Sequence, residues 1–172
     1  MSQPNSLAVR IGEPDGAKQR PCLEDYPLRT AEKLRFADTD CNGHISNAVF
    51  AVCCQNARME LLHDPNRIPL PVNAQFVIVR LEIDFFGEMH WPGTVVIGTR
   101  CERIGRASLM VAQALFVDGN CAASARSTVA LMDRATRRAT PLPSETAAAL
   151  QAFGDAYGSN GVGQPGRQGQ EG

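Results

Sequence analysis

The sequence lacks an excess of charge of either sign and lacks any long apolar run. Its 172 residues include 17 basic and 18 acidic side chains, which give a formal net charge of −1. A nearly neutral chain has no general attraction to nucleic acid or to an anionic membrane. No apolar run reaches the roughly 20 residues that a transmembrane helix needs, and the N-terminus lacks the basic-then-apolar pattern of a signal peptide. We therefore expect neither nucleic acid nor a membrane as a partner.

Paired cysteines and regularly spaced metal ligands are also missing. The six cysteines contain no CxxC pair and no recurrent spacing. This pattern favours small apolar thiols that stay reduced, and hence a cytoplasmic location. The three histidines, His44, His63 and His90, are scattered rather than set at ligand spacing. The spacing therefore predicts no metal site.

What is present suits one domain with flexible ends. A hydrophobic content of 44% is enough for one sizeable core. Residues 1–28 are rich in proline, glycine and charge and are interpreted as a flexible N-terminal extension. Residues 158–172 are rich in glycine and glutamine, which predicts a disordered tail. The folded domain is then expected at residues 29–157.

The hydrophobic pattern of this domain predicts one strand, then one unusual helix, and then four strands. The helix should begin at Ser46 or Asn47 and end near His63, because Pro65 disfavours helix at the residue before it. Residues 48–54 are apolar without interruption, so the helix should be buried on all sides. Strands are expected at 31–37, 74–86, 94–104, 107–117 and 121–132, with a closing amphipathic helix from Ser144 to about Tyr157.

This order of elements predicts an α+β fold, in which a curved antiparallel sheet wraps around one long central buried helix. Along the first strand after the helix, alternation places five apolar residues on one face: Val77, Val79, Leu81, Ile83 and Phe85. The other face of such a sheet needs a cover. We therefore expect a homo-oligomer, either a homodimer or a homotetramer.

The segment from Leu34 to Leu62 resembles the hotdog-fold acyl-CoA thioesterases of the 4-hydroxybenzoyl-CoA thioesterase type. The resemblance lies in an Asp-x-Asp pair, a Gly-His loop, an asparagine at the helix start and an Ala-Arg-x-Glu segment. These motifs are Asp38-Thr39-Asp40, Gly43-His44, Asn47 and Ala57-Arg58-Met59-Glu60. The resemblance covers about residues 30–140. It implies the hotdog fold and hydrolysis of an acyl-CoA thioester, with no cofactor apart from the CoA of the substrate.

In that family the second aspartate of the pair does the chemistry, which places the reactive carboxylate at Asp40. Its position just before a helix suits attack on the carbonyl as a nucleophile, or activation of water as a general base. The helix N-terminus would polarise the carbonyl, with the N–H of Asn47 as the donor. His44 is expected to support this site, by fixing the turn or by exchanging a proton.

We expect four further residues to contact the substrate: Gly43, Ser46, Phe50 and Arg106. Arginine suits the CoA phosphates because guanidinium binds phosphate well. Asp38 is interpreted as a loop organiser, and Arg58 with Glu60 as a structural pair or an oligomer contact.

Three alternatives remain open at this point. Asp40 could serve only to close its loop, because aspartate is common in turns and caps. The segment Asp40 to His44 also resembles the Asp-x-Asn-Pro-x-His pattern of hotdog enoyl-thioester hydratases, but it is one residue short and has no proline. The third alternative is a non-catalytic protein that binds an acyl thioester.

Overall fold

The computed structural model describes residues 20–154, so most of the predicted extension and the whole predicted tail lie outside the described residues. The elements in chain order are η1 (Leu23–Asp25), β1 (Leu28–Leu34), η2 (Phe36–Asp38), α1 (Asn47–Leu62), β2 (Ala74–Phe85), β3 (Gly93–Ile104), β4 (Ser108–Val117), β5 (Asn120–Asp133) and α2 (Ser144–Gln151). Within residues 20–154, no helix has the length and apolar character needed to cross a membrane.

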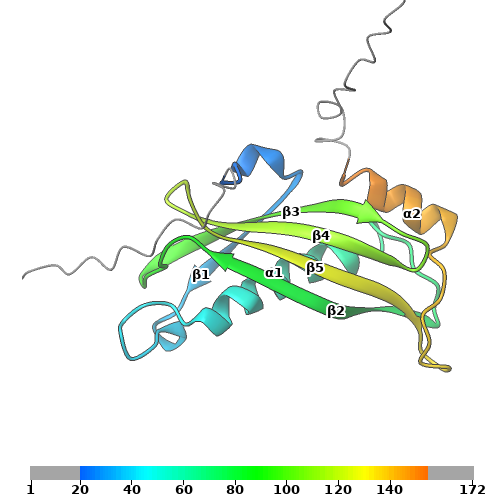
Figure 1. Ribbon diagram of the computed structural model, residues 1–172, viewed down its shortest axis with the longest axis horizontal. Coiled ribbons are helices and arrows are strands. Elements are labelled where there is room, and N and C mark those ends of the chain that lie inside the picture. Colours follow the sequence, from blue (N-terminus) through cyan, green and yellow to red (C-terminus); the bar gives the residue numbers. More distant parts are fainter. Residues whose placement is uncertain (1–19, 155–172) are drawn as a thin grey trace, which may run out of the picture.

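The five strands form one antiparallel sheet in the order β1-β3-β4-β5-β2, with α1 against one face (Figure 1). The predicted α+β arrangement of a curved sheet and one main helix is confirmed. Four strands lie within about a residue or two of their predicted bounds, whereas β1 begins and ends three residues early. It ends early because Phe36–Asp38 forms a 3-10 turn instead of continuing the strand.

Helix α1 supplies the centre of the core and matches its predicted bounds. Phe50, Cys53, Cys54 and Ala57 are at most 2% exposed and pack against β3, β4 and β5. Burial on all sides, however, is not observed: the side chain of Val52 is 49% exposed. A single sheet covers only one side of a helix, so the outward side of α1 stays open in one chain.

Strand β2 departs from strict alternation at a bulge. Ile78 pairs with Val129 and Arg80 with Thr128, which leaves Val79 as the extra residue. An extra residue shifts the later side chains to the opposite face. Val79 itself is 66% exposed. Because of the register shift, the predicted grouping of Val77 and Val79 on one face with the three apolar residues after them is wrong.

The opposite face of the sheet is partly covered by the segment that precedes β1 (Figure 1). Tyr26 is 4% exposed and packs on Gly98, where an added Cβ would lie 2.5 Å from the tyrosine ring. Burial raises the pKa of Tyr26 to about 12. Residues Leu23–Leu28 are thus packed on the sheet, so a flexible extension that runs to residue 28 is too long by several residues.

A buried polar network fastens α1 to the sheet. Arg58 is 7% exposed, and its Nη1 donates to Gln113 Oε1 at 3.1 Å and to Ser127 Oγ at 3.0 Å. Gln113 Nε2 donates in turn to the Cys54 carbonyl at 2.9 Å. Burial lowers the pKa of Arg58. The predicted pairing of Arg58 with Glu60 is wrong, because Arg58 points into the sheet while Glu60 is exposed.

Candidate active site

The residues between η2 and α1 form a tight loop that closes on itself. The Asp40 N–H donates to the His44 carbonyl at 2.8 Å, and the Gly43 N–H donates to the Asp40 carbonyl at 3.1 Å. Gly43 has a φ of +80°, in the left-handed region where glycine is favoured. Thr39 and Ile45 form an isolated antiparallel bridge across the loop. This geometry fixes Asp40 directly in front of the helix.

One oxygen of the Asp40 carboxylate is held by main-chain donors. Oδ1 accepts the N–H of Asn42 at 2.8 Å and the N–H of His44 at 3.2 Å. Asp40 is exposed, and within residues 20–154 no donor to its second oxygen is observed. The carboxylate therefore closes the turn with one oxygen, while the other is available to a ligand.

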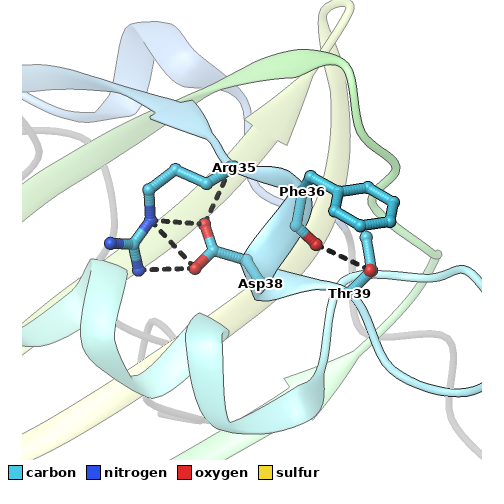
Figure 2. Close-up of polar contacts among 4 residues, drawn as sticks. All are labelled: Arg35, Phe36, Asp38 and Thr39. Atoms are coloured by element: carbon cyan, nitrogen blue, oxygen red, sulfur yellow. Dashed lines mark hydrogen bonds and ion pairs between the residues drawn. The ribbon is translucent and has the colours of Figure 1, made fainter.

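Asp38 has a different role, shown in Figure 2. Its carboxylate accepts the backbone N–H of Arg35 at 2.8 Å and the Arg35 guanidinium Nη2 at 2.6 Å. These hydrogen bonds hold the pKa of Asp38 below its ordinary value. Thr39 Oγ1 donates to the Phe36 carbonyl at 2.7 Å and closes the same turn (Figure 2). The interpretation of Asp38 as a loop organiser is confirmed.

The N-terminus of α1 follows the loop directly. The Ser46 N–H donates to the Asp38 carbonyl at 2.9 Å, and the Val49 N–H donates to the Ser46 carbonyl at 2.8 Å. For the N–H groups of Asn47 and Ala48, no acceptor is observed in the described part of the chain. Such groups at a helix start carry partial positive charge and attract an anionic oxygen. Asn47 and Asp40 thus lie at the same exposed end of α1.

Two of the predicted substrate contacts are not on the exposed loop that holds Asp40. Phe50 is 2% exposed and packs edge-on against Phe85, with ring centroids 5.1 Å apart, so it belongs to the core wall beneath the loop. Arg106 follows the far end of β3, where its carbonyl accepts the Leu142 N–H at 2.8 Å. A strand of 12 residues spans roughly 36 Å. One chain therefore does not bring Arg106 to Asp40.

The structure adds two residues that sequence reasoning missed, Glu88 and His90. The Ile45 N–H donates to the Met89 carbonyl at 2.8 Å, which ties the loop that contains Asp40 to the segment between β2 and β3. Met89 is fully buried, so its two neighbours point outward beside His44. The alternating Glu-Met-His pattern was a signal for this outward pair, but nothing in the sequence indicated that it meets His44.

Two of the surface hollows formed by residues 20–154 bear on the site. One, of about 340 Å³, lies between α1 and β2 and is lined by Val52, Arg58 and Val79, among others. The other, of about 530 Å³, lies on the opposite face of the sheet beside Tyr26 and Arg100. Asp40 lines neither of these two hollows and is exposed on the rim formed by the loop before α1.

Comparison with known proteins identifies a family and several similar structures. A family model described as the thioesterase-like superfamily matches residues 34–150. Among curated proteins, no sequence matches significantly. A predicted thioesterase from Bacillus stearothermophilus is 28% identical with a TM-score of 0.67, and the match covers 81% of this chain and 98% of that chain.

A thioesterase from Thermus thermophilus, crystallised in complex with coenzyme A and Zn, is also 28% identical with a TM-score of 0.67, over 76% of this chain and 96% of its own. A 1,4-dihydroxy-2-naphthoyl-CoA thioesterase from Synechocystis is 17% identical with a TM-score of 0.63, over 72% of this chain and 94% of its own, and so shows a shared fold alone. These likenesses confirm the expected hotdog fold.

Proposed function

The chain belongs to the thioesterase-like superfamily, and from this premise we propose that it hydrolyses the thioester bond of an acyl-CoA, with Asp40 as the reactive carboxylate. Family membership and the similar thioesterases indicate thioester hydrolysis as the class of reaction. The coenzyme A bound to the Thermus thermophilus protein supports CoA as the thiol part of the substrate.

The proposal is carried by the way in which Asp40 is held. Main-chain N–H groups fix Oδ1, and the residue is exposed at the start of α1. The second oxygen can attack the thioester carbonyl, which forms an acyl anhydride and expels the CoA thiolate; water then cleaves the anhydride. Alternatively the carboxylate takes a proton from a water molecule that attacks the carbonyl. Both routes consume one water and release a carboxylic acid and CoA.

The N-terminus of α1 would stabilise the negative charge that develops on the carbonyl oxygen. The N–H of Asn47 is the proposed donor, because it lies at the first helical position, close in sequence to the loop that holds Asp40. Loss of one such donor typically raises the barrier by about 3 kcal/mol. His44 contributes by its backbone N–H to Asp40, Gly43 by its turn, and Ser46 by the cap position ahead of the helix.

The reaction is tested with a panel of acyl-CoAs that carry short, long and aromatic acyl groups, read by release of free CoA thiol. Turnover of at least one member is expected. Tight binding of an acyl-CoA without thiol release would contradict hydrolysis and favour a non-catalytic protein that binds acyl thioesters. Loss of the enoyl chromophore of crotonyl-CoA without thiol release would favour the hydratase.

The role of Asp40 is tested with Asp40→Asn, whose amide oxygen can still accept the two main-chain hydrogen bonds. Turnover should fall by about 10²- to 10⁴-fold while thermal melting stays nearly unchanged. Asp64→Asn is the matched control, because Asp64 Oδ1 closes a similar turn at the other end of α1 by accepting the Asn66 N–H at 2.9 Å. Equal activity in the two variants would refute the role of Asp40.

We further propose that a second copy of this chain covers the groove between α1 and β2. Val52, Ile78 and Val79 are 49–66% exposed there, and β2 is an edge strand with unpaired backbone groups. A homodimer or homotetramer would enclose the open rim near Asp40. Val79→Glu should lower the mass measured by light scattering, whereas Val72→Glu, on a 93% exposed loop residue, should not. A monomeric wild-type protein would contradict the proposal.

The proposed location is the reducing cytoplasm. All six cysteines of the chain are free thiols, with Cys22 and Cys41 exposed and the other four buried. Free exposed thiols persist best where the redox poise keeps them reduced.

A further inference from the structure

Two loops distant in sequence place two imidazoles around one carboxylate. His44 Nε2 lies 3.4 Å from Glu88 Oε2, and His90 Nε2 lies 3.5 Å from the same oxygen. The two imidazole rings are nearly perpendicular, with centroids 5.1 Å apart. We propose that His44, Glu88 and His90 form a binding site for a divalent transition metal of the zinc class.

The spacing of the three side chains fits such an ion. With bonds of about 2.05 Å and tetrahedral angles, two zinc ligands lie roughly 3.3 Å apart. The two nitrogen–oxygen distances, 3.4 and 3.5 Å, match this edge closely. All three ligand atoms lie within 4.8 Å of one another, so small side-chain rotations bring the two nitrogens to the same spacing.

The donor set selects the kind of metal. Two imidazole nitrogens and one carboxylate oxygen suit zinc and its neighbours better than Mg²⁺ or Ca²⁺, which prefer oxygen ligands. The side chains are 37%, 61% and 57% exposed for His44, Glu88 and His90. The fourth position therefore opens to solvent and can take water or a ligand atom.

The backbone holds the site in place on both sides. The Ile45 N–H donates to the Met89 carbonyl at 2.8 Å, and the buried Met89 side chain anchors the residues on either side of it. The His44 main chain belongs to the turn that holds Asp40. A bound metal would clamp the loop that contains Asp40 to the segment between β2 and β3. Metal binding is measured without substrate, so its outcome is independent of the proposed hydrolysis.

The test uses the untagged full chain, stripped with a chelator and titrated with ZnCl₂ in a calorimeter. One equivalent should bind, and the thermal melting temperature should rise with added zinc. Glu88→Gln and His90→Ala should weaken binding by at least about 10- to 100-fold, the loss caused even by removal of an outer-sphere partner. His63→Ala is the matched control, since His63 is exposed at the far end of α1, and it should bind as the wild type does.

A second measurement needs no variant. Diethyl pyrocarbonate modifies accessible histidines, and peptide mass spectrometry reports each position separately. Zinc should protect His44 and His90 from modification and leave His63 reactive. The proposal is overturned if the stripped chain binds no zinc, if binding survives Glu88→Gln and His90→Ala unchanged, or if zinc protects the three histidines equally.

Discussion

The hydrogen bonds of the buried network between α1 and the sheet predict how much free energy of unfolding is lost when the network is broken. Gln113 is 1% exposed and forms three hydrogen bonds, to Arg58, to the Cys54 carbonyl and to Thr99. Gln113→Leu keeps the volume but removes all three bonds. The bond from the charged Arg58 contributes about 1.5–3 kcal/mol and each neutral bond about 1 kcal/mol. We expect the free energy of unfolding to fall by about 3.5–5 kcal/mol.

The assay is urea and thermal unfolding followed by circular dichroism. For a domain of this size, the expected loss corresponds to a melting temperature lower by roughly 10–20 °C. Gln151→Leu, on the exposed end of α2, is the control and should change the free energy by less than about 0.5 kcal/mol.

A double variant tests whether part of this loss comes from leaving the charged Arg58 side chain buried with fewer acceptors. Gln113→Leu alone leaves the charged Arg58 buried with fewer acceptors, whereas replacement of both partners by apolar groups removes that cost. Arg58→Met combined with Gln113→Leu should therefore be more stable than Gln113→Leu alone. A loss of less than about 1 kcal/mol in Gln113→Leu, or a double variant less stable than Gln113→Leu, would contradict the stabilising role of this network.

Three further predictions concern other parts of the fold. The Arg35 hydrogen bond holds the pKa of Asp38 below its ordinary value of 3.8, so Asp38 stabilises the fold at neutral pH and loses this contribution as the pH falls through the lowered pKa. Asp38→Asn should lower the melting temperature at pH 7, and the difference from wild type should shrink below pH 3.8. Burial raises the pKa of Cys53 and Cys101 to about 12 and that of Cys54 to about 11, so iodoacetamide at pH 8 should label Cys22 and Cys41 first, as mapped by mass spectrometry. Gly98→Ala should cost about 1–3 kcal/mol in chemical unfolding because its Cβ overlaps Tyr26, and Tyr26→Ala in the same chain should cancel most of this overlap.

Local pattern was enough to predict the helix and most strands. The candidate cap at Ser46 or Asn47 and the proline at position 65 predicted both ends of the helix, and alternation predicted β2 and β4. The bulge at Val79 was not predictable from the sequence. Apolar residues alternate both before and after the extra residue, and nothing at the residue itself marks a change of register. The packing of Tyr26 on Gly98 was missed because it depends on contact between two segments that are far apart in the sequence.

The candidate site also has one part that local sequence predicts and another part that only the fold brings together. The turn around Asp40 and the adjacent helix start are local in sequence, so their residues could be proposed together. The approach of Glu88 and His90 to His44 depends on how the β2–β3 segment meets the loop before α1. Arg106 was grouped with Asp40 by chemistry alone, and the length of β3 separates them within one chain.

The turn that holds Asp40 places few demands on its neighbours. Both donors to Oδ1 are main-chain groups, so the side chains of Cys41 and Asn42 can change without moving the carboxylate. The hydrogen bonds to Oδ1 exclude proline at positions 42 and 44, and the left-handed φ favours glycine at position 43. The side chains at positions 41 and 42 can therefore vary while the anchoring of the Asp40 carboxylate stays constant.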